Sequence, residues 1–375
     1  MITLDTLRKA AKKRLAQMRR TQPDARLADA QLQVAREHGF SSWRKLKAHV
    51  EAMIAAAATE QESASAAFLR AVAAGAIGDI HRMLDATPGL VNAHGPHPYW
   101  GGRPQPLHVA IENGRRDIFD LLLARGADID GDNVSYDHWS PLMLAVKRPD
   151  MRDDLLRRGV AIGLAEALVL ADDERVETLL RSNGLPVAVP NNGSWLAFAR
   201  TTVAIDLLLT AGAEIDRKDR WGTRPIEAMS RLGPDGAHLV DHMAARGSAP
   251  SAADFARLGD IAALVRLAES DPEAATLDSV IMAAVDARQH EIGVWLLERG
   301  ADPNARSDAT SRHTALHAAA WNGDLRMVRL LVDAGADPHV RDLQYDADPR
   351  GWAATSLEVT DNRDCIEVAE YLGSL

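Results

Sequence analysis

Apolar residues recur at spacings of three and four along most of the 375-residue chain, a pattern that predicts amphipathic helices. Pro23-Asp24 ends the first predicted helix, and a second helix is expected over about 27–38. Ser41 and Ser42 can cap a third helix that carries Trp43. One clear stripe lies near the start of the chain, formed by Leu4, Leu7, Ala11, Leu15 and Met18.

From about residue 66 onward, the predicted helices come in pairs that repeat. Residues 105–110 read Gln-Pro-Leu-His-Val-Ala, and residues 314–319 read Thr-Ala-Leu-His-Ala-Ala. Each is followed by Asn-Gly, an apolar helix and then Gly-Ala-Asp. The composite recurs with a period of about 33 residues. Roughly ten units can be phased in this way, with degenerate signals over about 160–275.

These motifs make residues 66–375 resemble a bacterial ankyrin-repeat array, most specifically over 105–130 and 277–340. The resemblance implies helix–turn–helix units stacked in single file, with finger loops toward a concave face. Residues 1–58 resemble a helical leader found ahead of such arrays. We therefore predict an all-α fold: an ankyrin-repeat solenoid of roughly ten units, its middle units degenerate, preceded by a small helical N-terminal segment. The predicted domains are a basic three-helix leader at 1–58, a connector at 59–65 and the array at 66–375.

Several residues of the repeats are interpreted as structural. In this family, the histidine of the Thr-Pro-Leu-His motif ties neighbouring turns by hydrogen bonds, so His108 and His317 are expected to do so here. Cys365 begins an apolar helix and is expected in the core. A left-handed backbone is expected after the second helices, at the glycines of the Gly-Ala motifs: Gly126, Gly212, Gly300 and Gly335.

Charge is distributed unevenly along the chain. Residues 1–50 carry twelve basic and four acidic side chains, a net charge of +8, whereas the whole chain carries −10. The remainder therefore carries −18, which indicates separate electrostatic roles for the leader and the array. A single cysteine, the lack of an apolar signal segment and the lack of a long apolar run predict a cytoplasmic protein without a membrane partner.

Two finger loops, residues 92–103 and 130–139, are longer and richer in aromatic residues than an ordinary ankyrin finger. Two of the four tyrosines and two of the eight tryptophans of the chain lie in them. Tyrosine, tryptophan and arginine are enriched in the energetically dominant parts of protein interfaces. The predicted binding residues are Tyr99, Trp100, Arg103, Tyr136, His138 and Trp139, with Trp221 and Tyr345 as outlying contacts.

Three interpretations of these loops stay open at this stage. They present a protein-binding surface, they line a small-ligand or catalytic pocket, or they pack on each other. A metal-assisted version of the pocket would use His94, His97 and Asp137, with Asp132 and His138 nearby. However, His-x-x-His on a proline-bearing loop is weaker than a helical metal motif, so no metal site is assigned.

The favoured function is non-catalytic recognition of a protein partner through the concave face and the finger loops. The acidic array favours a partner with a basic surface. No nucleophile arrangement, phosphate-binding glycine loop or dinucleotide motif occurs, so we expect no cofactor and lean against an enzyme. A small molecule bound by the loops is the alternative. Nucleic-acid binding through the basic leader is a second alternative.

Overall fold

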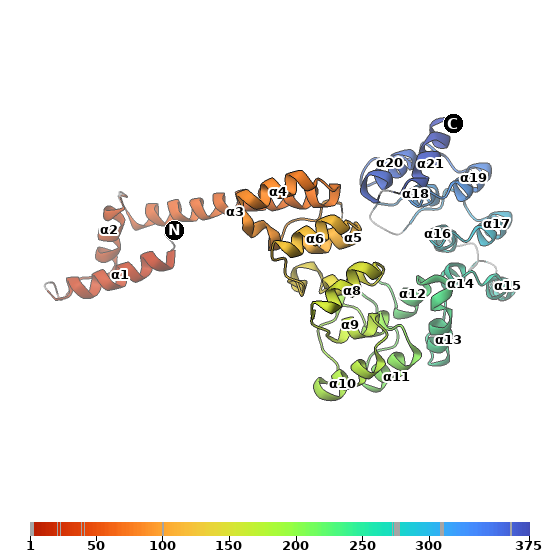
Figure 1. The fold of residues 1–375 in the computed structure, drawn as a ribbon, viewed down its shortest axis with the longest axis horizontal. Coiled ribbons are helices and arrows are strands. Elements are labelled where there is room, and N and C mark those ends of the chain that lie inside the picture. Colours follow the sequence, from red (N-terminus) through yellow and green to blue (C-terminus); the bar gives the residue numbers. More distant parts are fainter. Residues whose placement is uncertain are drawn as a thin grey trace. The chain divides into compact units, whose positions relative to one another are not determined.

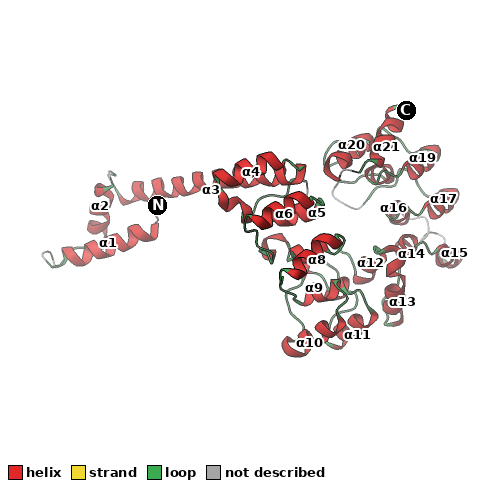
Figure 2. Cartoon of the chain, viewed as in Figure 1, coloured by secondary structure: helices red, strands yellow, loops and turns green. Residues whose placement is uncertain are grey.

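The computed structural model describes residues 4–20, 22, 24–38, 40, 42–99, 101–271, 273, 278–307, 311–360 and 362–375. Within these ranges the secondary structure is helical, apart from an isolated antiparallel bridge between Arg306 and Thr314 (Figure 2). The all-α prediction is therefore confirmed.

The chain divides into two compact units, Met1–Leu69 and Arg70–Leu375. The first contains α1 (Leu4–Met18), α2 (Leu27–Glu37) and most of α3 (Trp43–Ala74). Ser42 accepts a hydrogen bond from the backbone N–H of Lys45, as expected for a helix cap. The predicted connector is helical and belongs to α3. The core of this unit is formed by Leu7, Ala11, Val34, Ala35, Leu46 and Val50.

The second unit is a solenoid of ten hairpins, counted over the described residues (Figure 1). Each hairpin has a first and a second element, and unit numbers below follow chain order. The ten pairs are the end of α3 with α4 (Ile77–Ala86), α5 (Pro106–Glu112) with α6 (Arg116–Ala124), α7 (Pro141–Ala145) with α8 (Pro149–Arg157), α9 (Leu164–Val169) with α10 (Asp173–Asn183), η4 (Trp195–Phe198) with α11 (Thr202–Thr210), α12 (Pro225–Ser230) with α13 (Ala237–Ala245), α14 (Ala252–Leu258) with α15 (Ile261–Ser270), α16 (Asp278–Asp286) with α17 (His290–Glu298), α18 (Ala315–Trp321) with α19 (Leu325–Asp333), and α20 (Pro349–Thr360) with α21 (Asp364–Gly373).

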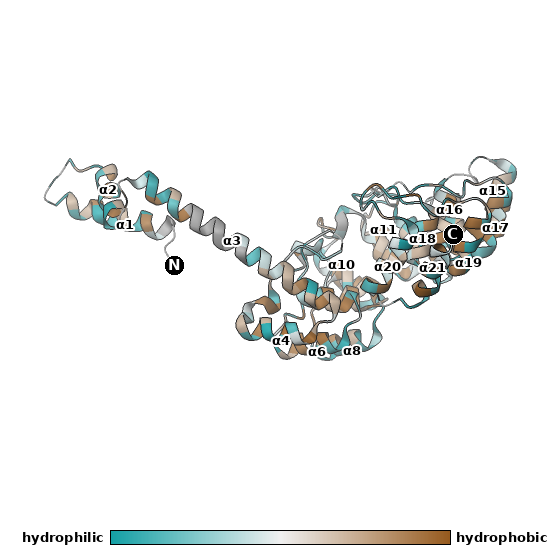
Figure 3. Cartoon of the chain, turned by 90° about the horizontal axis from the view of Figure 1, so that it is seen from above, coloured by the Kyte–Doolittle hydropathy of each residue, from teal (hydrophilic) through white to brown (hydrophobic). Residues whose placement is uncertain are grey.

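Stacking of like elements builds the core of the solenoid. First helices contact the first helices of neighbouring units, as α12, α14, α16, α18 and α20 do in succession. Second helices stack in the same order, as α17, α19 and α21 do. Each hairpin is too small to bury its apolar face alone, so the buried surface exists only between neighbours. Figure 3 shows the resulting apolar and polar faces of the helices.

Two histidines connect consecutive units, as predicted. Nδ1 of His108 accepts a hydrogen bond from the backbone N–H of Gln105 at 3.3 Å, and its Nε2 donates to the carbonyl of Trp139 at 3.0 Å. His317 does the same with the N–H of Thr314 at 3.1 Å and the carbonyl of Ala347 at 3.1 Å. Both side chains are fully buried, so these bonds satisfy their ring nitrogens.

The structure also confirms the predictions for Cys365 and for the glycines of the Gly-Ala motifs. Cys365 is fully buried. Gly126, Gly212, Gly300 and Gly335 have φ values of 85°, 94°, 90° and 98°, the left-handed region that glycine adopts at least cost.

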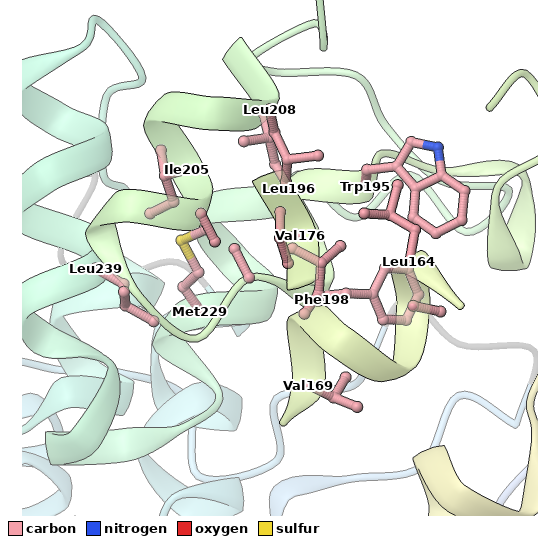
Figure 4. Close-up of a cluster of buried hydrophobic side chains, with 14 of the residues drawn as sticks. Leu164, Val169, Val176, Trp195, Leu196, Phe198, Ile205, Leu208, Met229 and Leu239 are labelled. Carbon is pink, nitrogen blue, oxygen red and sulfur yellow. The ribbon is translucent and has the colours of Figure 1, made fainter. Parts of the chain in front are cut away.

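The fifth unit shows how the degenerate middle of the array is completed. Its first element is only a 3-10 turn, η4, in place of a helix. Trp195, Leu196 and Phe198 of this turn are buried among the leucine and methionine side chains of the neighbouring units (Figure 4). The indole Nε1 of Trp195 donates to the carbonyl of Pro186 at 2.9 Å. Large side chains thus fill the space that a regular helix would occupy, and the stack continues through the unit.

We find no helix in the described ranges that is both long and apolar enough to cross a membrane.

Candidate functional site

The two long finger loops pack against each other. The ring of His97 stacks on that of Tyr136, with centroids 6.2 Å apart and an interplanar angle of 6°. Both side chains bond to Glu112 at the end of α5: the Tyr136 hydroxyl donates to Oε1 at 2.6 Å, and His97 Nε2 lies 3.0 Å from Oε2. Tyr136 is only 6% exposed. Its aromatic ring therefore holds the loops together.

The other predicted loop residues have different surroundings. Tyr99 is half-buried beside His97, with ring centroids 6.1 Å apart, and burial followed by the charge of Glu358 raises the pKa of its hydroxyl. The backbone N–H of Arg103 donates to the carbonyl of Ser135, so this residue also joins the loops. His138 is exposed, with a left-handed backbone. Trp100 lies outside the described residues.

The three candidate metal ligands have separate partners. His94 lies 3.4 Å from Asp132, His97 bonds to Glu112, and Asp137 pairs with Arg220. Over the part of the chain that the structure describes, no group of three His, Cys, Asp or Glu side chains is arranged to hold a metal ion. We therefore build no metal chemistry on these loops.

The main concave feature is a hollow of about 1060 Å³ that extends over units three to ten. Its lining residues run in sequence from Trp139 to Gln344. Apolar lining comes from Phe198, Met282 and several alanines. The charged side chains of the lining are Arg200, Arg231, Arg257, Arg306, Asp219, Glu227 and Asp286.

Three of these charges occupy the same place in consecutive units. Arg231, Arg257 and Asp286 each stand two residues before a residue with positive φ, which is Gly233, Gly259 and Arg288 respectively. This position ends the first helix of a unit, so the three side chains face the hollow in a row. The corresponding positions of units two and nine hold Glu112 and Trp321.

Three of the arginines of the hollow, Arg200, Arg231 and Arg306, are poorly neutralised, whereas Arg257 is paired with Asp254. Burial lowers the pKa of Arg200, and burial together with the charge of Arg231 lowers that of Arg257. Within the described residues, no carboxylate lies within 4.0 Å of Arg200, Arg231 or Arg306. Arg200 donates to the carbonyls of Ala197 and Ala199, and Arg306 to the carbonyl of Arg312.

The carboxylates of the hollow are largely engaged. Asp219 accepts hydrogen bonds from the backbone N–H groups of Trp221 and Thr223 at 2.9 and 2.8 Å. Glu227 binds Nε of Arg224 at 2.9 Å. The Asp286 side chain faces the open space of the hollow, yet the surrounding protein raises the pKa of its carboxyl. The charges of Arg257 and Arg231 offset only part of this increase.

A buried carboxylate lies beneath the row of arginines. Asp254 is 0% exposed and occupies the place in unit seven that His108 and His317 hold in theirs. It accepts hydrogen bonds from the hydroxyls of Ser230 and Ser251, both at 2.7 Å, and from Arg257 at 3.3 Å. The carboxylate therefore fixes the Arg257 side chain from below.

The far wall of the hollow is built around His313. Its Nδ1 lies 3.0 Å from the Ser307 hydroxyl and 2.8 Å from that of Ser311, and its ring is 4.8 Å from that of Trp352. Burial, followed by the charge of His317, lowers the pKa of His313 to about 4. His313 is therefore neutral near pH 7 and contributes a polar but uncharged surface.

Asp342 organises the adjacent loop, which carries Tyr345. Asp342 is 2% exposed and accepts hydrogen bonds from the N–H groups of Gln344 and Tyr345, and from Trp352 Nε1 at 2.9 Å. Burial alone would raise the pKa of the Asp342 carboxyl. These hydrogen bonds, together with the one from the Ala347 N–H, outweigh burial, so the pKa is lowered. The loop tip, including Tyr345 at 57% exposure, is thereby held in place.

The hollow brings together two of the predicted binding residues, Trp139 and Trp221, and Tyr345 is adjacent in sequence to the lining residue Gln344. Trp221 is 64% exposed and lies under the guanidinium of Arg220, 4.4 Å from the ring centroid. The four arginines were missed from the sequence. For Arg231 and Arg257 the available signal was a charge at a repeat position that holds an apolar residue in some other units, such as Val169 two residues before the left-handed Ala171.

Family comparisons agree with the hairpin architecture. Residues 252–342 match a model of three ankyrin repeats, and residues 105–131 match a single ankyrin repeat. An ankyrin repeat-containing protein of Treponema pallidum (strain Nichols) is 30% identical over 138 residues, which is 37% of this chain. The match spans 39% of that relative's length. The crystal structure of the human ASB11 ankyrin repeat domain covers 55% of this chain and 97% of its own, at 19% identity and a TM-score of 0.34.

The chain therefore contains ankyrin repeats, and its fold is the predicted ankyrin-repeat solenoid. Repeats of this class generally mediate protein–protein interactions.

Proposed function

We propose that the protein is a non-catalytic recognition module that binds a protein partner along the hollow and its finger loops. The observation that carries this proposal is the hollow itself, which joins side chains from units three to ten into one concave surface. A volume of about 1060 Å³ lies at the upper end of the roughly 300–1,000 Å³ that small-molecule pockets occupy. A peptide segment fits such a surface better than a single small ligand.

Exposed aromatic side chains on the finger loops supply the expected anchors. Trp221 and Tyr345 keep 64% and 57% of their surface exposed, although each is held by its loop. Large rings in fixed positions lose little conformational entropy on binding, which favours their use at interfaces. Tyr136 supports this surface from within, since its ring and hydroxyl hold the two long loops together.

The charge of the partner follows from the hollow more than from the whole chain. The acidic net charge of the array predicts attraction to a basic surface, and that expectation applies to the outer faces. The lining of the hollow instead carries four arginines against three carboxylates, two of which are engaged. We therefore expect the charges that line the hollow, and not the net charge of the chain, to select the partner.

The experiment is a capture assay with the immobilised full-length chain and cross-linking mass spectrometry of the captured proteins. The double variant Trp221→Ser with Tyr345→Ser should lose a stoichiometric partner while keeping its helical circular dichroism. Val203→Ser with Ile366→Ser is the matched control, because these exposed apolar side chains lie on the second helices α11 and α21. Equal loss in both double variants, or cross-links confined to the second helices, would contradict the proposal.

A further inference from the structure

The arginines of the hollow form a row and not a cluster. Arg200 follows η4 in unit five, Arg231 ends the first helix of unit six, and Arg257 lies near the end of α14 in unit seven. Arg306 follows in the loop after unit eight. Arg200, Arg231 and Arg257 thus come from three successive units, and Arg306 comes from the loop that joins units eight and nine. A single phosphate would engage one or two of these arginines, whereas an extended chain with repeated negative charges can interact with more of them.

The guanidinium groups have unused binding capacity. Arg231 is exposed to the hollow and, among the described residues, has no hydrogen-bonded or ion-paired partner. Over the described ranges, Arg200 and Arg306 donate to backbone carbonyls alone, which leave their charge unneutralised. The planar guanidinium binds a carboxylate through two parallel hydrogen bonds, so each of these groups can take one acidic side chain.

Apolar surface lies beside the charges. Trp139, Phe198 and Met282 line the same hollow and can cover the aliphatic parts of a bound peptide. Asp286 lies within the row and interacts with Arg231 and Arg257, so it offsets part of their charge. The net lining charge nevertheless differs in sign from that of the array as a whole.

We infer that the hollow recognises an extended, acidic peptide segment of the partner, with Arg200, Arg231 and Arg306 each receiving a carboxylate, while Arg257 is held by Asp254 and adds its charge to the row. This inference rests on the proposed function and names the chemistry of its partner. Charge-assisted pairs in a concave, partly desolvated site are stronger than exposed ones, which gives the row its selectivity. A partner segment with spaced glutamates or aspartates and an interposed apolar residue fits the lining.

The test is fluorescence anisotropy of a fluorescein-labelled Glu-Ser repeat peptide titrated with the full-length chain at low ionic strength. Arg231→Gln should weaken binding about tenfold, and Arg231→Glu should weaken it further, because one charge-assisted pair is lost and then replaced by repulsion. Arg231 has no structural bond to lose, so the variants should keep the wild-type circular dichroism. Arg266→Gln and Arg266→Glu on α15 are the matched controls, with the same charge changes at an exposed site of a second helix.

Several outcomes would overturn the inference. These are no binding of the Glu-Ser peptide at millimolar concentration, equal binding of a Lys-Ser peptide, or equal weakening by Arg231→Glu and Arg266→Glu. Displacement of the peptide by inorganic phosphate at equal concentration would assign the row to a small anion. If the capture assay succeeds while the peptide fails, the recognition function stands and only the acidic partner is wrong. If Trp221 and Tyr345 prove dispensable while the peptide binds as stated, the arginine-lined site stands and the finger-loop contribution is wrong.

Discussion

The Tyr136 hydroxyl lies 2.6 Å from Oε1 of Glu112, and this hydrogen bond joins the second finger loop to the first helix of the unit before it. Tyr136→Phe keeps the ring stacking on His97 but removes the donor from a half-buried carboxylate. A hydrogen bond to a charged group contributes about 1.5–3 kcal/mol, so we expect the free energy of unfolding to fall by that amount. Urea denaturation followed by circular dichroism measures it.

Val134→Ala is the control for this substitution, since Val134 is 72% exposed in the same loop. It should leave the denaturation midpoint unchanged. A Tyr136→Phe protein as stable as the wild type would show that Glu112 is satisfied without the hydroxyl.

His317→Ala should destabilise the end of the array. The substitution removes both the link to the partly buried Ala347 carbonyl of the next finger and the acceptor for the buried Thr314 N–H. Leaving such groups unsatisfied costs about 1–3 kcal/mol. Hydrogen exchange should show faster exchange first in α20 and α21, because a solenoid transmits stability between neighbours. His339→Ala, at an exposed position, should leave the exchange pattern as it is.

The buried imidazole of His313 should make stability depend on pH. Its pKa is about 4 in the folded chain against 6.5 in an unfolded one, so unfolding takes up a proton between these values. Above pH 6.5 the neutral imidazole therefore costs no stability. As the pH falls toward 4, the free energy of unfolding decreases by about 2–3 kcal/mol. His317 adds to the same trend, since burial also lowers its pKa.

Urea midpoints between pH 7 and pH 4.5 measure this dependence. His313→Gln should flatten it, and the control His339→Gln should retain the wild-type slope. An unchanged slope in His313→Gln would place the proton uptake elsewhere.

Gly236→Ala should destabilise the sixth unit more than an ordinary surface substitution. An added Cβ would lie 2.1 Å from the carbonyl oxygen of Met229, a distance that forces the backbone to move. Overpacking of this kind costs about 1–3 kcal/mol. Gly78→Ala in α4 is the matched control, because nothing lies within 4 Å of its added Cβ, and it should be neutral or stabilising by up to about 1 kcal/mol. Thermal unfolding of the two variants compares them directly.

The local parts of this fold follow from the sequence because each depends on a few neighbouring residues. The apolar spacing predicts the hairpins, the Gly-Ala motifs predict the left-handed turns, and the Thr-Pro-Leu-His position predicts the bonds of His108 and His317. The fifth unit was harder to phase, because bulky residues of a 3-10 turn replace a helical stripe.

The hollow could not be predicted in the same way. Its lining comes from positions far apart in the chain, and its depth depends on small rotations that accumulate from one unit to the next. The equivalence of Arg231 and Arg257 is also hidden in the sequence. The spacing from the start of the first helix to the left-handed glycine varies between units, so counting from the helix start does not align them. Unit seven, which ends this segment at Gly259, has one residue fewer than unit nine, which ends it at Gly323. The burial of Tyr136 likewise depends on how two separate loops meet.

The enclosed carboxylate of Asp254 couples the joining of two adjacent hairpins to the position of Arg257. A change at this site would loosen the hydroxyl groups that hold two adjacent hairpins and would also release the guanidinium that lies above them. A substitution that removes the Arg257 guanidinium is therefore expected to weaken the scaffold as well, because it takes a charged partner from a carboxylate that is buried between two units.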